Sequence, residues 1–134
     1  MDRDPYSRRR AVLGGVILSF LLTTSAGAAD KKPEEFREAI QAQDKEDWSE
    51  SIRLLQHALE KQPEDGSPVR IYGTRYLSYL PLYYMGLAWY KQNDCAKALE
   101  QWDRSLGIGA VQTTAEFQRL LEDSEKCKEK AIRK

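Results

Sequence analysis

A helical pattern that occurs twice constrains the fold of this chain most. Residues 48–59 carry the first copy and residues 95–106 carry the second. In each copy a small residue precedes an aliphatic one, a large apolar residue follows, and a second small–aliphatic pair comes three positions later: Ser51, Ile52, Leu55, Ala58 and Leu59, then Ala98, Leu99, Trp102, Ser105 and Leu106. This spacing marks one face of an α-helix and places small side chains where a neighbouring helix comes close. It predicts stacked helix pairs, which typically hold partners rather than perform chemistry.

The first 29 residues have the composition of an export signal. Three arginines, Arg8 to Arg10, precede an uncharged and mostly apolar run over residues 11–22. Small residues at 26–29 then suit cleavage before Ala29 or Asp30. The alternative is an uncleaved membrane anchor, although a span needs about 20 apolar residues. We therefore expect a periplasmic or secreted protein, exported by the general or the twin-arginine route.

Charge excludes two classes of partner. The chain has 21 basic and 21 acidic residues, and residues 1–29 hold four arginines and two aspartates, which leaves 17 basic and 19 acidic residues after cleavage. A slightly negative chain lacks the basic surface that nucleic acids need. It also lacks a polybasic patch for anionic lipid, so we expect membrane contact only if the N-terminal segment is retained.

Periodicity predicts five helices in one domain over residues 30–134. The expected ranges are about 34–44, 48–61, 81–92, 95–106 and 114–132. Charged residues at 44–47 and Asn93-Asp94 mark turns, while Pro63 to Pro68 reads as a loop. An insertion over residues 66–78 is rich in β-branched and aromatic residues. Its structure is open between an extended path and a short 3₁₀ path.

The stretch from Met85 to Leu106 resembles the tetratricopeptide repeat family. Gly86 matches the family's helix-packing small residue, Ala98 its central alanine and Trp102 its large aromatic residue. Ser51 and Ala98 lie 47 positions apart, whereas the repeat advances by about 34 residues, and the insertion accounts for the difference. The resemblance implies an all-α fold: a short α-solenoid of antiparallel helix pairs. Its parts would be repeats at about 32–65 and 79–112 and a capping helix at 114–132.

The two cysteines are predicted to form a disulfide. Cys95 and Cys127 lie equally far from the expected link between the last two helices, so antiparallel packing brings them level. An even cysteine pair in an exported protein is typically bonded. The alternative is two buried, unpaired thiols. Redox catalysis is disfavoured because the reactive Cys-x-x-Cys spacing is absent.

Peptide binding is the function that the resemblance implies. In tetratricopeptide domains the first helix of each pair lines a concave groove that takes peptides. The corresponding residues here are Phe36, Ile40, Gln43, Tyr83, Leu87, Tyr90 and Lys91, with Arg70 and Arg75 expected on the rim as carboxylate partners. The alternative is that the insertion folds back and buries this stripe.

Groups for catalysis are scarce in the sequence. His57 is the only histidine, and no glycine-rich phosphate loop occurs outside the N-terminal segment. We therefore predict a protein without enzymatic activity, cofactor or metal site, whose partner is another protein or a peptide. The alternatives are a permanent subunit of a cell-envelope complex and, third, an enzyme.

Overall fold

The computed structural model describes residues 34–63 and 66–133. These residues are mostly helical, at 72%, and form five α-helices and one two-stranded hairpin. The predicted signal peptide lies outside the described residues. In chain order the elements are α1 (Glu34–Asp44), α2 (Trp48–Lys61), β1 (Pro68–Tyr72), β2 (Arg75–Ser78), α3 (Pro81–Lys91), α4 (Cys95–Ile108), the 3₁₀ helix η3 (Ala110–Thr113) and α5 (Glu116–Ile132).

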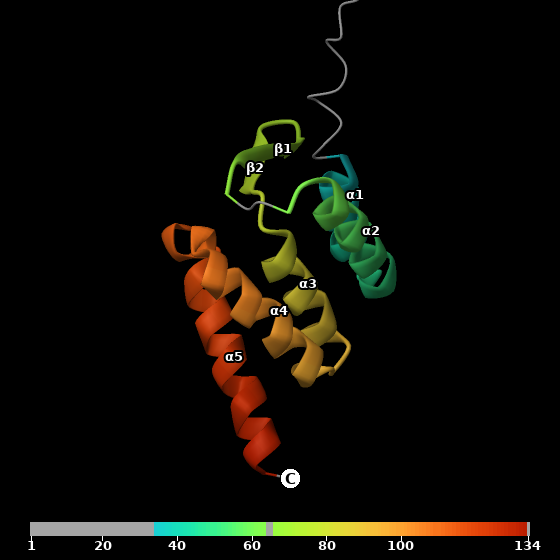
Figure 1. Cartoon of the computed structure of the whole chain (residues 1–134). Helices are drawn as coiled ribbons and strands as arrows, with labels where there is room; N and C mark the ends of the chain where they lie inside the picture. Colours follow the sequence, from blue (N-terminus) through green and yellow to red (C-terminus); the bar gives the residue numbers. More distant parts are fainter. Residues whose placement is uncertain (1–33, 64–65, 134) are drawn as a thin grey trace, which may run out of the picture.

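The helices pack in adjacent pairs along the chain. Each of α2, α3 and α4 contacts the helix before it and the helix after it. Figure 1 shows the result, with α1 and α2 on one side, α3 and α4 in the middle and α5 on the other side. The helical part of the predicted fold is confirmed, whereas the all-α class needs a correction because residues 68–78 form a β-hairpin.

The turns inside the two helix pairs are copies of each other. Glu46 and Asn93, 47 positions apart, both adopt a positive φ, 60° and 62°. Each precedes an aspartate whose side chain accepts a hydrogen bond from a backbone N–H at the start of the next helix. The backbone hydrogen bonds also match: Lys45, Glu46 and Asp47 donate to Ala42, Gln43 and Ala42, as Gln92, Asn93 and Asp94 donate to Trp89, Tyr90 and Trp89.

The hairpin forms because its sequence alternates. Val69 and Ile71 are buried, while Arg70 and Tyr72 between them are exposed. A two-residue turn joins the strands, and Gly73 adopts the positive φ of 54° that such turns favour. β1 contacts α1, and Figure 1 places the hairpin at the end of the helices where α3 begins.

Two close contacts hold neighbouring elements together, one between α3 and α4 and one between the end of the hairpin and α2. Trp102 is fully buried, and its indole N–H donates to the carbonyl of Tyr83 at 3.1 Å. The same ring lies against Gly86, where a Cβ atom would overlap it. Tyr79, which follows the hairpin, donates to the carbonyls of Ala58 at 3.1 Å and Gln62 at 2.9 Å. It thereby satisfies carbonyl groups at the C-terminal end of α2.

The helix ends differ slightly from prediction in the second half. α4 runs through Gly107 to Ile108 and ends only at Gly109, whose left-handed conformation (φ 89°) and N–H bond to Ser105 terminate it. The following residues form η3, so α5 begins at Glu116 rather than near residue 114.

Candidate interaction surface

The side chains predicted to line a groove lie mostly inside the molecule. Of the nine predicted partner-binding residues, five are buried: Phe36, Ile40, Gln43, Tyr83 and Leu87. Tyr90 is half-buried, and Lys91 is exposed. These five side chains are therefore largely shielded from solvent in the structure. A binding role for them stays a prediction.

Helix α5 packs near some of these predicted partner-binding residues. The hydroxyl of Tyr84 donates to Glu116 in the first turn of α5 at 3.1 Å. Burial raises the pKa of Tyr83 to about 12. Of the charged residues on α5, Arg119 lowers this pKa, while Glu116 and Asp123 raise it. Near the other end of α5, Lys130 lies over the ring of Tyr90 at 5.6 Å. Helix α5 thus packs near residues that were expected to bind peptides.

The first helix is covered in a similar way. The ring of Phe36 packs edge-on against Tyr79 at 5.0 Å and Tyr84 at 5.7 Å. Gln43 donates to the hydroxyl of Ser51 at 3.0 Å and to the carbonyl of Tyr84 at 2.9 Å, which ties α1 to α2 and α3. These polar and aromatic groups are already paired within the chain, as buried polar groups must be.

The outer face of the hairpin presents the aromatic side chains that the core does not use. Tyr72 is 50% exposed and Tyr76 is 60% exposed. Arg70, also exposed, is the cross-strand partner of Tyr76, and Arg75 is the partner of Tyr72, with a register shift between the two pairs. We call these four residues, Arg70, Tyr72, Arg75 and Tyr76, the outer hairpin face. Both arginines predicted on the rim of a groove belong to it.

One end of this face is held in place by α1. Arg75 Nη1 lies 2.5 Å from the hydroxyl of Tyr72 and 3.1 Å from Oδ2 of Asp44, the last residue of α1. The Tyr72 hydroxyl also donates to Asp44 at 3.4 Å. The hydrogen bond to Tyr72 and the charge of Asp44 raise the pKa of Arg75. Arg70, by contrast, donates only to the carbonyl of Gly73, at 2.7 Å, among the bonds of the described residues.

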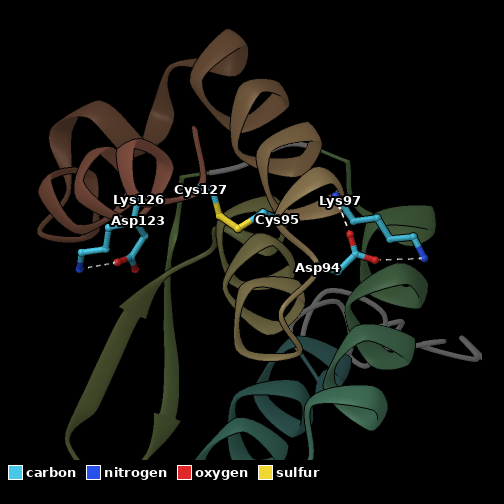
Figure 2. The surroundings of a disulfide bond; sticks show 6 residues. All are labelled: Asp94, Cys95, Lys97, Asp123, Lys126 and Cys127. Atoms are coloured by element: carbon cyan, nitrogen blue, oxygen red, sulfur yellow. Dashed lines mark hydrogen bonds and ion pairs between the residues drawn. A yellow bond between two sulfur atoms is a disulfide. The ribbon is translucent and has the colours of Figure 1, made fainter. Parts of the chain in front are cut away.

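The predicted disulfide is confirmed. Cys95 at the start of α4 is bonded to Cys127 of α5, with 5.3 Å between their Cα atoms. Figure 2 shows the bond between two ion pairs, Asp94 with Lys97 on α4 and Asp123 with Lys126 on α5. Cys127 is fully buried, whereas Cys95 is partly exposed. The bond joins the pair of α3 and α4 to α5.

A shallow cleft of 810 Å³ opens beside the disulfide. The turn between α3 and α4 and the facing sides of α4 and α5 form its walls, with Leu99, Lys130 and Ala131 among the lining residues. Its two charged side chains, Asp94 and Lys130, have opposite sign. The cleft therefore offers no net charge to select a ligand.

Two special kinds of site are absent from the described residues. Within residues 34–63 and 66–133, no helix has the length and apolarity to cross a membrane. The same ranges hold no group of three or more His, Cys, Asp or Glu side chains suited to a metal ion. His57 is exposed on α2, with Nδ1 at 3.9 Å from Glu60.

Comparisons with known proteins leave the site to be judged on its geometry. Scans of the chain against protein-family models, curated proteins and solved structures find no match in any of the three.

Sequence reasoning missed Tyr72 and Tyr76 as candidate site residues. Both lie in the insertion, whose secondary structure the sequence left open. The signal that would have found Tyr72 is the alternation from Val69 to Tyr72, in which β-branched residues take every second position. That pattern buries Val69 and Ile71 and turns Arg70 and Tyr72 outward. Tyr76 lies on the facing strand, which shows no such alternation.

Proposed function

We propose that this chain is a non-catalytic protein-interaction module that works in the periplasm or outside the cell and binds its partner through the outer hairpin face. The observation that carries the proposal is the exposure of Tyr72 and Tyr76 beside two arginines. Tyrosine and arginine are enriched at binding hot spots because they combine a large contact area with a polar group. Neither tyrosine belongs to the core of the helix pairs.

We further propose that the helix pairs are two tetratricopeptide-type repeats with α5 as the capping helix. The matched turns, 47 residues apart, support this assignment. The contact of Gly86 with Trp102 and the full burial of Ala58 and Ala98 also support it, since these positions carry the family's small-residue pattern. Two repeats provide a short scaffold, and the hairpin between α2 and α3 is an element that does not belong to the repeat pattern.

The disulfide supports the proposed compartment. Disulfides form and persist in oxidising environments such as the periplasm and the extracellular space. The predicted signal peptide over residues 1–29 agrees with export, so both features favour a partner outside the cytoplasm.

A permanent subunit of an envelope complex is the second candidate. It is favoured by exposed apolar side chains on the last two helices: Ile108, Leu121 and Ile132. An obligate subunit would bury them against a neighbour and should self-associate when made alone. A module that binds its partner reversibly should be a monomer in sedimentation at micromolar concentration.

Photocrosslinking in the native host tests the proposed function. A benzoylphenylalanine replaces Tyr76, and a matched control carries the same group at Glu122, which is exposed on α5. We expect Tyr76 to capture a partner that the Glu122 position does not. The purified partner should then bind the wild-type chain and bind the Tyr72→Ala/Tyr76→Ala variant about tenfold more weakly or worse. Equal capture at both positions, or equal binding by the variant, would contradict the proposal.

A further inference from the structure

One edge of the hairpin has no neighbouring strand in the part of the chain that the structure describes. Among the described residues the sheet contains β1 and β2 only, so each strand pairs on one side. β1 also contacts α1, whereas β2, within these same residues, makes extensive contact with β1 alone and reaches α1 through the bond of Arg75 to Asp44. The far edge of β2 is therefore the accessible one.

The register indicates which backbone groups line this edge. The N–H of Tyr79 donates to the carbonyl of Ser67, and these two residues continue the register that pairs Val69 with Leu77. Because hydrogen-bonded and non-hydrogen-bonded pairs alternate in an antiparallel ladder, the N–H and C=O groups of Tyr76 and Ser78 point away from β1. None of the turn, loop and cap bonds among the described residues uses them.

The side chains beside this edge favour an acidic ligand. Arg75 and Tyr76 belong to β2 itself, and Arg70 lies across the ladder from Tyr76. Asp44 is paired with Arg75, while Arg70 has no carboxylate within ion-pair distance among the described residues. A glutamate or aspartate on an added strand would supply that carboxylate, and charge-assisted bonds of this kind are among the stronger ones.

We propose that the free edge of β2 takes up an extended, acidic segment of a partner protein as a third strand. The outward backbone groups of Tyr76 and Ser78 provide the main-chain hydrogen bonds, and Arg70 pairs with a carboxylate of the segment. Strand addition of this kind derives its affinity from the main chain and its selectivity from the side chains. The inference rests on the proposed function and adds the chemistry of the partner and its mode of binding.

A designed peptide tests the proposal directly. The probe is a fluorescently labelled peptide of about seven residues, blocked at both ends, in which valine and glutamate alternate; the control replaces each glutamate with lysine. Fluorescence anisotropy with the full chain, disulfide intact, should show binding of the acidic peptide and about tenfold or more weaker binding of the basic one. Equal binding of the two peptides, or no binding of the acidic one, overturns the proposal.

Removing single backbone N–H groups distinguishes strand addition from binding through side chains alone. Ser78→Pro removes an N–H that points away from β1, while Ser78→Ala keeps it. We expect the proline variant to bind the acidic peptide about tenfold more weakly and the alanine variant to bind like wild type. Circular dichroism verifies the fold of both. A peptide N-methylated along one edge gives the same test on the unaltered protein, and its undiminished binding overturns the proposal.

Two further outcomes have defined meanings. If Tyr76 captures a partner that binds Ser78→Pro normally, the proposed function stands and strand addition is wrong. If sedimentation shows a wild-type dimer that Ser78→Pro dissociates, the edge is occupied by a second copy of this chain, and the acidic-segment proposal is overturned.

Discussion

Gly86 carries a packing role that no larger residue can fill. A Cβ at this position would overlap the indole of Trp102, which is itself fixed by its bond to the carbonyl of Tyr83. We expect Gly86→Ala to lower the free energy of unfolding by about 1–3 kcal/mol, because overpacking forces the ring or the backbone to shift. Urea denaturation followed by tryptophan fluorescence measures the change.

Gly107 provides the matched control for that substitution. It also lies within a helix, but nothing stands within 4 Å of a Cβ built there. Gly107→Ala should therefore raise the free energy of unfolding by up to about 1 kcal/mol, as expected for glycine replaced in an open helix position. Equal effects of the two substitutions would show that the Gly86–Trp102 contact is not tight.

The hydroxyl of Tyr79 joins the hairpin to the end of α2. It donates to two carbonyls there, and the side chain is 1% exposed. We expect Tyr79→Phe to cost about 1–2 kcal/mol of unfolding free energy, since it removes the hydroxyl donor of the Gln62 carbonyl, whereas the Ala58 carbonyl keeps the backbone N–H of Gln62. Differential scanning calorimetry gives the value. Tyr76→Phe serves as the control, because its exposed hydroxyl should contribute almost nothing; a similar loss in both would contradict the prediction.

The contacts of some single residues could be predicted from the sequence, and those of others could not. The pairing of Cys95 with Cys127 followed from their equal distance to one helix link, which is a local property of the chain. The bonds of Tyr79 could not be foreseen in this way, because their acceptors lie 21 and 17 positions away and depend on how the insertion folds.

At the scale of elements, the disulfide between α4 and α5 should contribute much of the stability of the C-terminal half. The cysteines are 32 positions apart, and closing a loop of that length stabilises by about 3–4 kcal/mol in the chain-entropy model. We expect Cys95→Ala/Cys127→Ala to lose about that amount in urea denaturation. The reduced wild-type chain should unfold at nearly the same urea concentration as the variant. An unchanged midpoint in both would show that helix packing alone holds α5.

The bounds of the helices agree closely with the prediction from the sequence, whereas the hairpin was not predicted. Helix bounds such as 34–44 and 48–61 agree with prediction because apolar spacing and the capping residue Asp47 act locally. The insertion was ambiguous because Val69, Ile71 and the tyrosines suit several conformations. Its structure depends on contact between β1 and α1, which lie far apart in the chain.

The whole molecule should lose stability at alkaline pH. Burial raises the pKa of Tyr83 to about 12 and also raises that of Tyr84 above its ordinary value of 10.0. Since the folded state favours the neutral phenols, their stabilising contribution is complete below pH 10 and falls as the pH rises through the folded pKa of each. Urea denaturation at intervals from pH 9 to 12 should therefore show a progressive decrease in the unfolding free energy.

Removing one of these phenols provides the control for the pH series. Tyr83→Phe should flatten the decrease, because it removes one of the two phenols whose pKa burial raises and leaves Tyr84. Its stability at pH 7 serves as the baseline, so a general loss of packing is distinguished from a change in slope. A slope equal to that of wild type would show that Tyr83 ionises as easily in the folded chain as in the unfolded one.

The position of the disulfide also determines how the molecule would yield to a mechanical load. If it were pulled from its two ends, the segment before Cys95 could extend fully. The segment between the cysteines could not, since its ends stay 5.3 Å apart. About 110 Å of contour would remain hidden in that loop. Reduction would release this length, so a single-molecule stretching trace would gain a corresponding increment only in the presence of a reductant.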